Sequence, residues 1–260
     1  MAFDVGNTAL KCAIGREGGW EVVFRMPTRP VDTLAARLCE ALGAAGEAIP
    51  QGERRWVVSS VCPEADAALA EDCRRRGVPG PRVFGRGLPI PIPVLVRQPE
   101  RVGTDRLLSA LGAREMLGAP CIAVGAGTAI TIDLVDADGR FAGGAIAPGF
   151  ELAARILHQA TACLPLVEPS RPSRPVGLDT EEAIRIGVDA FCRGGVAALV
   201  AGMRRQLGER GVRLRGVVVS GGAASRLLPL ELHAGGAPPE ARHVPDLIFR
   251  GMAAALQRQD

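Results

Sequence analysis

The sequence contains no tyrosine, one lysine and only three histidines among its 260 residues. Its seven cysteines are an odd number, and no two of them form a Cys-x-x-Cys pair. Because neither residue type has the spacing of a metal-ligand set, we expect no zinc site, and we expect the cysteines to be reduced and mostly buried. The histidines, to which we assign structural or surface roles, are His158, His233 and His243.

The sequence also has little net charge and no long uninterrupted apolar run. The net charge of +3 is spread along the chain without a basic stripe, so nucleic-acid binding is not supported. We find no secretion signal at the N-terminus and no segment that approaches the length of a membrane span. We therefore expect a cytoplasmic protein without a membrane partner.

The sequence does contain two similar turns, each expected to follow a strand. Residues 3–8 and 124–129 align on Gly6 and Gly127. Glycine lets the backbone approach a ligand closely and adopt positive φ, so such a turn can point successive N–H groups at an anion. A plain hairpin is the better reading of either turn alone, but the pair favours two halves that bind one phosphorylated ligand. Side-chain donors in the turns are Asn7, Thr8 and Thr128.

Two charged residues near the first turn are suited to a nucleotide. Asp4 cannot face phosphate directly, but a carboxylate beside phosphate can hold Mg²⁺, usually through water. Lys11 is the only lysine, and it lies three residues after the Gly-Asn-Thr turn. Lysine is a compact point charge suited to phosphate, which favours a role for Lys11 at the same site. The second turn has Gly125 where the first has Asp4.

Strand, hairpin and helix signals alternate along the chain, which predicts an α/β fold. The expected strands are residues 2–5, 9–14, 20–25, 56–61, 121–125, 129–135, 140–147 and 216–220. The expected helices are residues 31–45, 63–76, 104–117, 149–160, 180–208, 222–229 and 246–257. The proline-rich stretch 78–99 is predicted to be neither regular helix nor central sheet and to connect two lobes, and residues 164–178 are predicted to be a loop.

The three strand signals after Pro120 repeat the order found at the N-terminus. An internal duplication is the simplest explanation. We accordingly expect one half over residues 1–103 and a second half over residues 104–260.

Several further motifs occur in a fixed order over nearly the whole chain. They are Asp4–Thr8, Pro99–Arg106, Gly127–Ala129 with Thr131 and Asp133, Gly143–Gly149, Asp179–Thr180, Ser220–Gly222 and Pro245–Leu247. No one of these motifs is decisive, but in order and spacing the chain resembles the type III pantothenate kinases.

The resemblance implies the fold of the acetate kinase, sugar kinase and actin superfamily, which has duplicated ribonuclease H-like domains with mixed sheets and a nucleotide cleft between them. It implies transfer of the γ-phosphoryl group of ATP, with Mg²⁺, to the primary hydroxyl of pantothenate. This reaction gives 4′-phosphopantothenate and is the first step of coenzyme A synthesis. Members of the family are usually homodimers that bind pantothenate near the subunit interface.

The resemblance also implies roles for individual residues. Asp105 matches the general base, although a helix N-cap or first-turn acid is the alternative reading. Arg106 is a candidate for a pantothenate oxygen or an interface ion pair. Thr180 matches a position that reaches pantothenate across the dimer, and we also expect it to cap its helix. The substrate-binding set is Gly103, Thr104, Asp105, Arg106 and Thr180. The ATP-binding set is Asp4, Gly6, Asn7, Thr8, Lys11, Gly127, Thr128, Gly221 and Gly222.

The chain departs from the family pattern at two places. Gly125 replaces an aspartate that usually binds a monovalent cation, typically potassium, and glycine has no side-chain ligand. Either the cation is absent, or another group replaces the carboxylate, or the protein turns over inefficiently. The lack of tyrosine also removes any aromatic contact ahead of Gly103, where Val96 and Arg97 lie.

Three functions follow from these residues. The first is an active pantothenate kinase without the usual potassium site. The second is a binding or regulatory protein, as the relatives called Bvg accessory factors were first described, and the third is a kinase for another small substrate. The presence of Asp4, Lys11 and Asp105 favours the first.

Overall fold

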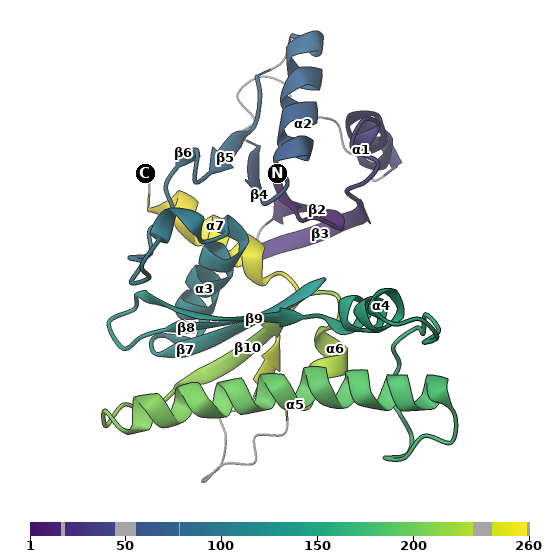
Figure 1. The fold of residues 1–260 in the computed structure, drawn as a ribbon. Helices are drawn as coiled ribbons and strands as arrows, with labels where there is room; N and C mark the ends of the chain where they lie inside the picture. The colour runs from purple at the N-terminus through teal and green to yellow at the C-terminus, as the bar shows by residue number, and fades with distance from the viewer. Residues whose placement is uncertain (17–18, 45–55, 78, 231–240, 259–260) are drawn as a thin grey trace. The chain divides into compact units, whose positions relative to one another are not determined.

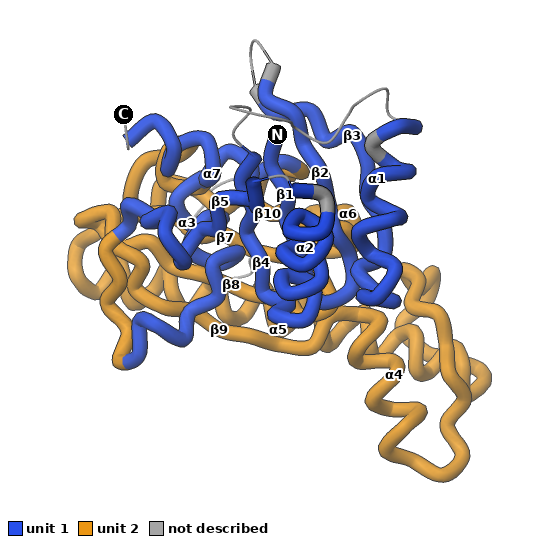
Figure 2. The backbone as a smooth tube through the Cα atoms, turned by 90° about the horizontal axis from the view of Figure 1, so that it is seen from above, with its two compact units in different colours: residues 1–92, 98–112, 246–260 blue, residues 93–97, 113–245 orange. Residues whose placement is uncertain are grey.

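The computed structural model describes residues 1–16, 19–44, 56–77, 79–230 and 241–258. The chain divides into two compact units, which Figure 2 shows in blue and orange. Unit 1 comprises residues 1–92, 98–112 and 246–260, and unit 2 comprises residues 93–97 and 113–245.

Unit 1 is built on a six-stranded mixed sheet of order β3-β2-β1-β4-β5-β6. The first three strands form an antiparallel meander, and β4 pairs with β1 in parallel. The strands are β1 (Ala2–Val5), β2 (Ala9–Arg16), β3 (Gly19–Pro27), β4 (Val57–Ser60), β5 (Arg82–Phe84) and β6 (Gly87–Leu88). The helices that lie wholly in this unit are α1 (Leu34–Ala44), α2 (Pro63–Arg76), the 3-10 turn Pro99–Arg101 and α7 (Leu247–Gln257).

Helix α3 (Thr104–Leu117) begins in unit 1 and ends in unit 2. Unit 2 has a five-stranded sheet of order β11-β10-β7-β8-β9. Its strands are β7 (Cys121–Ala126), β8 (Ala129–Val135), β9 (Phe141–Pro148), β10 (Gly216–Ser220) and β11 (Ala241–His243). Its helices are α4 (Phe150–Ala160), α5 (Thr180–Gly208) and α6 (Ala224–Leu227), and Figure 1 labels these helices and the strands β7 to β10.

The two sheets share one plan, which confirms the predicted duplication. In unit 2, β7, β8 and β9 form an antiparallel meander and β10 pairs with β7 in parallel, as β4 does with β1. The likeness extends to the chain after each meander, where the N–H of Thr28 donates to the Thr8 carbonyl (3.0 Å) and the N–H of Gly149 donates to the Thr128 carbonyl (2.9 Å).

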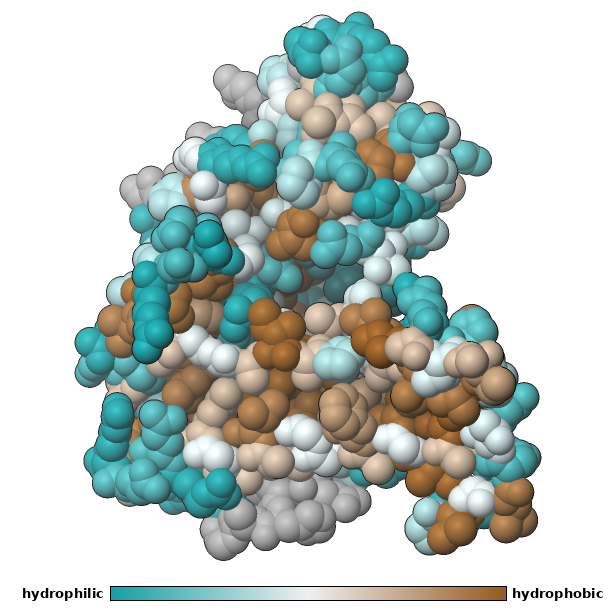
Figure 3. Space-filling model, in the orientation of Figure 1, coloured by the Kyte–Doolittle hydropathy of each residue, from teal (hydrophilic) through white to brown (hydrophobic). Residues whose placement is uncertain are grey.

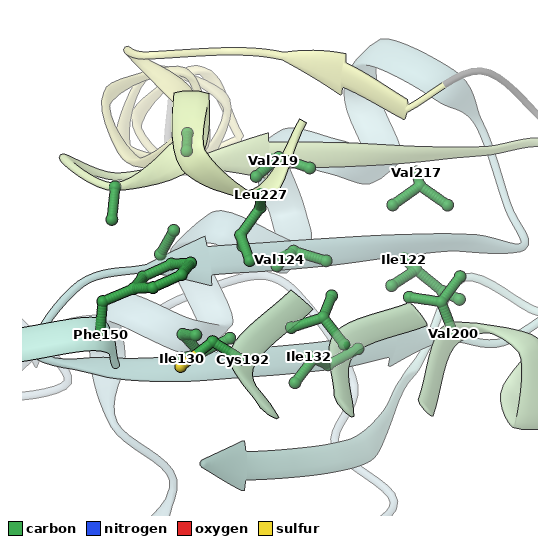
Figure 4. Packing of buried hydrophobic residues seen from close by; sticks show 14 of the residues in the cluster. Ile122, Val124, Ile130, Ile132, Phe150, Cys192, Val200, Val217, Val219 and Leu227 are labelled. Carbon is green, nitrogen blue, oxygen red and sulfur yellow. The ribbon is translucent and has the colours of Figure 1, made fainter. Parts of the chain in front are cut away.

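Helix α5 covers one face of the unit 2 sheet and supplies much of its core (Figure 4). Its buried residues, which include Val188, Cys192 and Val200, recur at helical spacing and pack against Ile130, Ile132 and other sheet residues. By length and composition α5 is the one described helix apolar enough to cross a membrane. One apolar face of α5 packs on the sheet, as the face of a core helix does.

The predicted elements are largely confirmed, with shifts of a few residues at their ends. Six expected elements have the bounds that the structure gives: β1, β8, β10, α2, α3 and α5. The expected end of the first long helix, at residue 45, lies outside the described residues. All seven cysteines are free, and five of them are buried, while Cys39 is half-buried and Cys163 is exposed.

Two elements differ from expectation. The stretch 78–99 contributes the strands β5 and β6, and β5 lies between β4 and β6 rather than at the edge of the sheet. The prediction that this stretch contains no central strand was therefore wrong. The three-residue strand β11 was not predicted, because it is too short for a periodic signal.

The division into units also differs from the expected boundary after residue 103. Helix α3 runs through that boundary and continues to Leu117. The C-terminal helix α7 belongs to unit 1, because it packs with β1, β3 and the apolar cluster that contains Leu108 and Phe249.

Candidate active site

Asp4 and Lys11 face each other across the first two strands of unit 1. They are register partners in the antiparallel β1–β2 pair, and the Lys11 Nζ lies 3.4 Å from an Asp4 carboxylate oxygen. Their side chains are 14% and 22% exposed, so the pair lies at the rim of the core with access to solvent. Such a cross-strand pair contributes only about 0.2–1 kcal/mol to stability. Little stability would therefore be lost if the two side chains contacted a ligand instead of each other.

Asp105 lies in the first turn of α3, in the same unit. Burial raises the pKa of its carboxyl group, while backbone N–H groups at the helix start and the charges of Arg106 and Lys11 oppose the rise. A side chain at position 103 would overlap with the Asp105 carboxylate, so Gly103 provides the room for it. The glycine that the sequence placed in the substrate set therefore also positions the candidate base.

The three charged groups form one electrostatic cluster. Burial raises the pKa of Asp4, Lys11 lowers it, and the negative charge of Asp105 raises it again. Lys11 likewise lowers the pKa of Asp105. Lys11 is thus a cation shared by two carboxylates, and the structure brings Asp105 to two residues near the N-terminus of the sequence.

Thr104 directs its side chain into the fold. Its hydroxyl lies 3.1 Å from the Ser59 hydroxyl and donates to the Ser60 carbonyl at 3.4 Å. Arg106 lies two residues after Thr104 in the same first turn of α3, where its N–H donates to the Gly103 carbonyl. Sequence reasoning missed Ser59. The available signal was a hydroxyl at the end of the apolar run Trp56–Val58, next to the strand that carries Asp4.

The first glycine turn closes with a hydrogen bond from the Gly6 N–H to the Ala9 carbonyl (3.0 Å), and Asn7 and Thr8 are exposed at its tip. The Thr28 hydroxyl donates to the Gly6 carbonyl at 2.7 Å and fixes the turn from behind. The N–H of Gly6 is used inside the turn. The tip residues are therefore the part of the turn that faces outward.

The second turn is one residue shorter and lies in unit 2. Val5 and Leu10 pair across four intervening residues, whereas Ala126 and Ile130 pair across three. Gly127 and Thr128 are exposed at the tip, and the Gly127 N–H donates to the Ala129 carbonyl at 3.1 Å.

Gly221 and Gly222 lie beside the second turn in the same unit. Gly221 has a φ of +104°, and a side chain there would overlap with the Ala126 carbonyl. The N–H of Ala223 donates to that carbonyl at 3.1 Å. The positive φ and the close approach to the Ala126 carbonyl both require glycine at 221, because a side chain would be strained by the first and would overlap in the second. Gly222 is exposed next to it.

Gly125 does not adopt positive φ, so its backbone conformation does not itself require glycine. It pairs with Thr131 across β7 and β8, and an added Cβ would lie 2.7 Å from the Thr131 hydroxyl oxygen. The Gly125–Thr131 pair occupies the place in unit 2 that Asp4–Lys11 occupies in unit 1. The duplicate site is therefore uncharged at both positions.

Thr180 is exposed at the start of α5, but it is not the N-cap. Asp179 takes that position, and its carboxylate accepts a hydrogen bond from the Glu182 N–H at 2.8 Å. The Glu182 carboxylate in turn accepts from the Leu178 N–H at 3.0 Å. Asp179 thus fills the capping role assigned to Thr180, whose side chain stays at the surface.

Comparison with known proteins bears on these residues. Residues 1–205 match the family model described as type III pantothenate kinase. The type III pantothenate kinase of Phenylobacterium zucineum is 35% identical over 262 residues, which cover 99% of this chain and 97% of that one. That of Maricaulis maris is 34% identical over 256 residues and covers 97% and 95%. The chain belongs to the type III pantothenate kinase family.

The fold agrees with that family assignment. A solved structure of a Campylobacter jejuni protein, described as a member of the Baf family of transcriptional activators, matches with a TM-score of 0.59 at 18% identity and covers 99% of this chain and 98% of that one. At that identity the likeness concerns the fold alone. The two mixed α/β sheets are the duplicated ribonuclease H-like domains of the actin and sugar kinase superfamily, as the resemblance implied.

Proposed function

We propose that this protein transfers the γ-phosphoryl group of ATP to the primary hydroxyl of pantothenate in coenzyme A synthesis. The observation that carries the proposal is the cluster of Asp4, Lys11 and Asp105 in unit 1. Phosphoryl transfer depends mainly on positioning and on neutralisation of charge, with a carboxylate that orients the attacking hydroxyl and accepts its proton. Membership of the family supports the same reaction.

Asp105 acts as the general base in this proposal. Its carboxylate is held at the start of α3, and its pKa is raised by burial, which makes it a stronger base than an exposed aspartate. Gly103, Thr104 and Arg106 form the segment around the substrate hydroxyl. Thr180 reaches pantothenate from a second copy of the chain.

ATP binds through both turns. In unit 1, Asn7, Thr8 and Lys11 contact phosphates, and Gly6 shapes the turn that presents Asn7 and Thr8. In unit 2, Thr128 does so, in the turn that Gly127 begins. Gly221 and Gly222 border the adenosine. Because Gly221 admits no side chain, the backbone there is open to close approach by a flat group.

The residues fit a magnesium ion held mainly by the nucleotide. Among the described residues no group of three or more histidine, cysteine, aspartate or glutamate side chains could form a metal site of protein ligands alone. Mg²⁺ commonly takes one or two carboxylates, several waters and substrate phosphates, and Asp4 supplies such a carboxylate, through water. When bound, the ion neutralises charge on the phosphates.

The deciding experiment is an assay of 4′-phosphopantothenate formation by the purified protein with ATP and Mg²⁺. Product formation at a turnover typical of enzymes, about 1–10³ per second, supports the proposal. Binding of ATP without product would instead support the regulatory alternative. Product with another small alcohol but not with pantothenate would support the third alternative.

The same assay with potassium or sodium tests the consequence of Gly125. Since neither Gly125 nor Thr131 carries a charge, we expect activity to depend weakly on the monovalent cation. A large, saturable activation by potassium but not by sodium would contradict this expectation. Gly125→Asp supplies a carboxylate, and Gly125→Asp/Thr131→Ala also removes the hydroxyl that would crowd it. Activation by potassium should be larger in the double variant than in Gly125→Asp alone.

We further propose a cytoplasmic homodimer formed through unit 2. Exposed hydrophobic side chains gather there, and Figure 3 shows brown surface over the part of unit 2 occupied by α4 and α5. They include Leu178 (78% exposed) and Phe191 (60% exposed), the first of which lies close to Thr180. The other exposed large hydrophobic residues of α4, α5 and the segment between them are Ile156, Leu166, Val176 and Leu199. An apolar surface of this kind marks an association site.

A further inference from the structure

Ser59 is a fully buried polar residue that follows two buried valines, Val57 and Val58, on β4. It is 0% exposed, on β4, and its register partner in the parallel β1–β4 pair is Asp4. A buried hydroxyl without a partner costs about 1–3 kcal/mol, so a serine here has to be satisfied by a specific contact. The contact is the Thr104 hydroxyl, at 3.1 Å.

The direction of the hydrogen bonds follows from the second partner of Thr104. The Thr104 hydroxyl donates its proton to the Ser60 carbonyl at 3.4 Å, so it accepts from Ser59. The chain Ser59–Thr104–Ser60 carbonyl therefore ties the first residue of α3 to two consecutive residues of β4. Both ends of this tether are well ordered by secondary structure.

The other side of the Thr104 side chain is also confined. Gly85 has a φ of +79°, and a Cβ there would lie 2.8 Å from the Thr104 methyl group. The threonine is thus held between a hydroxyl partner on β4 and a backbone that approaches its methyl group. Helix α3 cannot rotate about its first turn without breaking one of these contacts.

We propose that Ser59 is a positioning residue for the reaction, an inference that rests on the proposed function. Through Thr104 it fixes the first turn of α3 and sets where the Asp105 carboxylate lies relative to Asp4 on the neighbouring strand. Ser59 itself contacts no reactant. The hydroxyl of Thr104 serves the tether and not the substrate.

The test is a double-variant cycle in the pantothenate assay. Ser59→Ala and Thr104→Val should each lower kcat by about 10-fold to 100-fold and leave both KM values within about twofold, because a misplaced base slows the chemical step without weakening binding. The double variant should be no slower than the slower single variant, since both changes break one contact. Thr104→Ser, which keeps the hydroxyl, should restore most of kcat.

The matched control is Ser60→Ala, one residue further along β4. The Ser60 hydroxyl bonds only within its own segment, to the Cys62 backbone, and its loss should leave kcat unchanged. Wild-type kcat in Ser59→Ala would overturn the inference. So would additive losses in the double variant with a raised KM for pantothenate in Thr104→Val, which would place the Thr104 hydroxyl on the substrate.

Hydrogen exchange separates this inference from the proposed function. If the wild-type protein forms no phosphopantothenate, the proposed function fails, and exchange of the α3 amides decides the role of Ser59 alone. Faster exchange at Arg106 and Leu107 in Ser59→Ala, but not in Ser60→Ala, supports the tether. Unchanged exchange in Ser59→Ala overturns it.

Discussion

Asp105 has a carboxylate that the fold makes costly to ionise. Its pKa in the folded protein is raised above the ordinary value of 3.8 by burial. As the pH rises from the unfolded value through the folded value, the folded state binds more protons than the unfolded state, and the free energy of unfolding falls. At neutral pH the ionised carboxylate of Asp105 therefore lowers the stability of the fold. The presence of an aspartate at this position has to be explained by something other than stability.

Replacement of Asp105 should separate activity from stability. Asp105→Asn removes the proton acceptor but keeps the shape, so kcat should fall by roughly 10²–10⁴. Thermal unfolding at pH 7 should occur at the same temperature or higher, and the difference from wild type should vanish below about pH 4. Kinetics and calorimetry measure both effects. Near wild-type turnover would remove Asp105 from the mechanism.

The shared cation Lys11 gives a second prediction, on the pH profile. Activity should fall as the pH drops through the pKa of Asp105, so the acid limb of kcat should lie above the ordinary aspartate value of 3.8. Since Lys11 lowers that pKa, Lys11→Met should move the limb to higher pH at saturating substrate. The control is Arg25→Gln, because Arg25 lowers the pKa of Asp4 and is not among the main influences on the pKa of Asp105. A limb that stays in place in Lys11→Met would contradict the cluster.

At the scale of elements, α3 is placed by its contact with α7. Two glycines make that contact close. A side chain at Gly251 would overlap with the Leu108 carbonyl, and one at Gly112 would lie 2.5 Å from the Leu247 carbonyl. Backbone lies on backbone at both points, so neither helix can adjust by rotating a side chain.

The α3–α7 contact predicts a sharp difference between two Gly→Ala changes. Gly251→Ala should lower the free energy of unfolding by about 1–3 kcal/mol, because the methyl group forces the helices apart. Gly194→Ala, on the exposed face of α5 with no atom within 4 Å of its Cβ, should raise it by about 0.5–1 kcal/mol. Denaturant titrations measure both changes. An equal effect of the two substitutions would refute the close contact.

The elements that could be predicted from the sequence are those whose signal is local. The strand at 129–135 and the helix at 180–208 have a period and a bounded length, and the two glycine turns have a motif. The contact of α7 with α3, the pairing of the three-residue β11 and the burial of Ser59 depend on residues far away in the chain. The charged cluster lies between these cases. The first turn and the single lysine indicated Asp4 and Lys11, the resemblance supplied Asp105, and only the fold shows that Lys11 acts on both carboxylates.

At the scale of the whole molecule, the apolar surface of unit 2 predicts the oligomeric state. Phe191→Asp should convert a dimer into a monomer, because it places a charge in the apolar surface. It should also raise the KM for pantothenate, since Thr180 would no longer reach the substrate of a second copy. The control is Val22→Asp, which alters a 41% exposed residue of unit 1 and should leave the dimer intact. Sedimentation and light scattering measure the mass, and a Phe191→Asp protein that stays dimeric would contradict the surface.

The neutral Gly125–Thr131 pair gives the duplicated fold an asymmetry of function. At this pair of positions the unit 1 meander has two ionisable side chains, Asp4 and Lys11. The unit 2 meander has only the backbone of Gly125 and the hydroxyl group of Thr131. Acid should therefore reduce activity by protonating carboxylates in unit 1 alone, while the ligand contacts proposed for unit 2 should not change at moderate pH. In a pH titration of the enzyme, the loss of activity on the acid side should therefore report on the unit 1 meander alone.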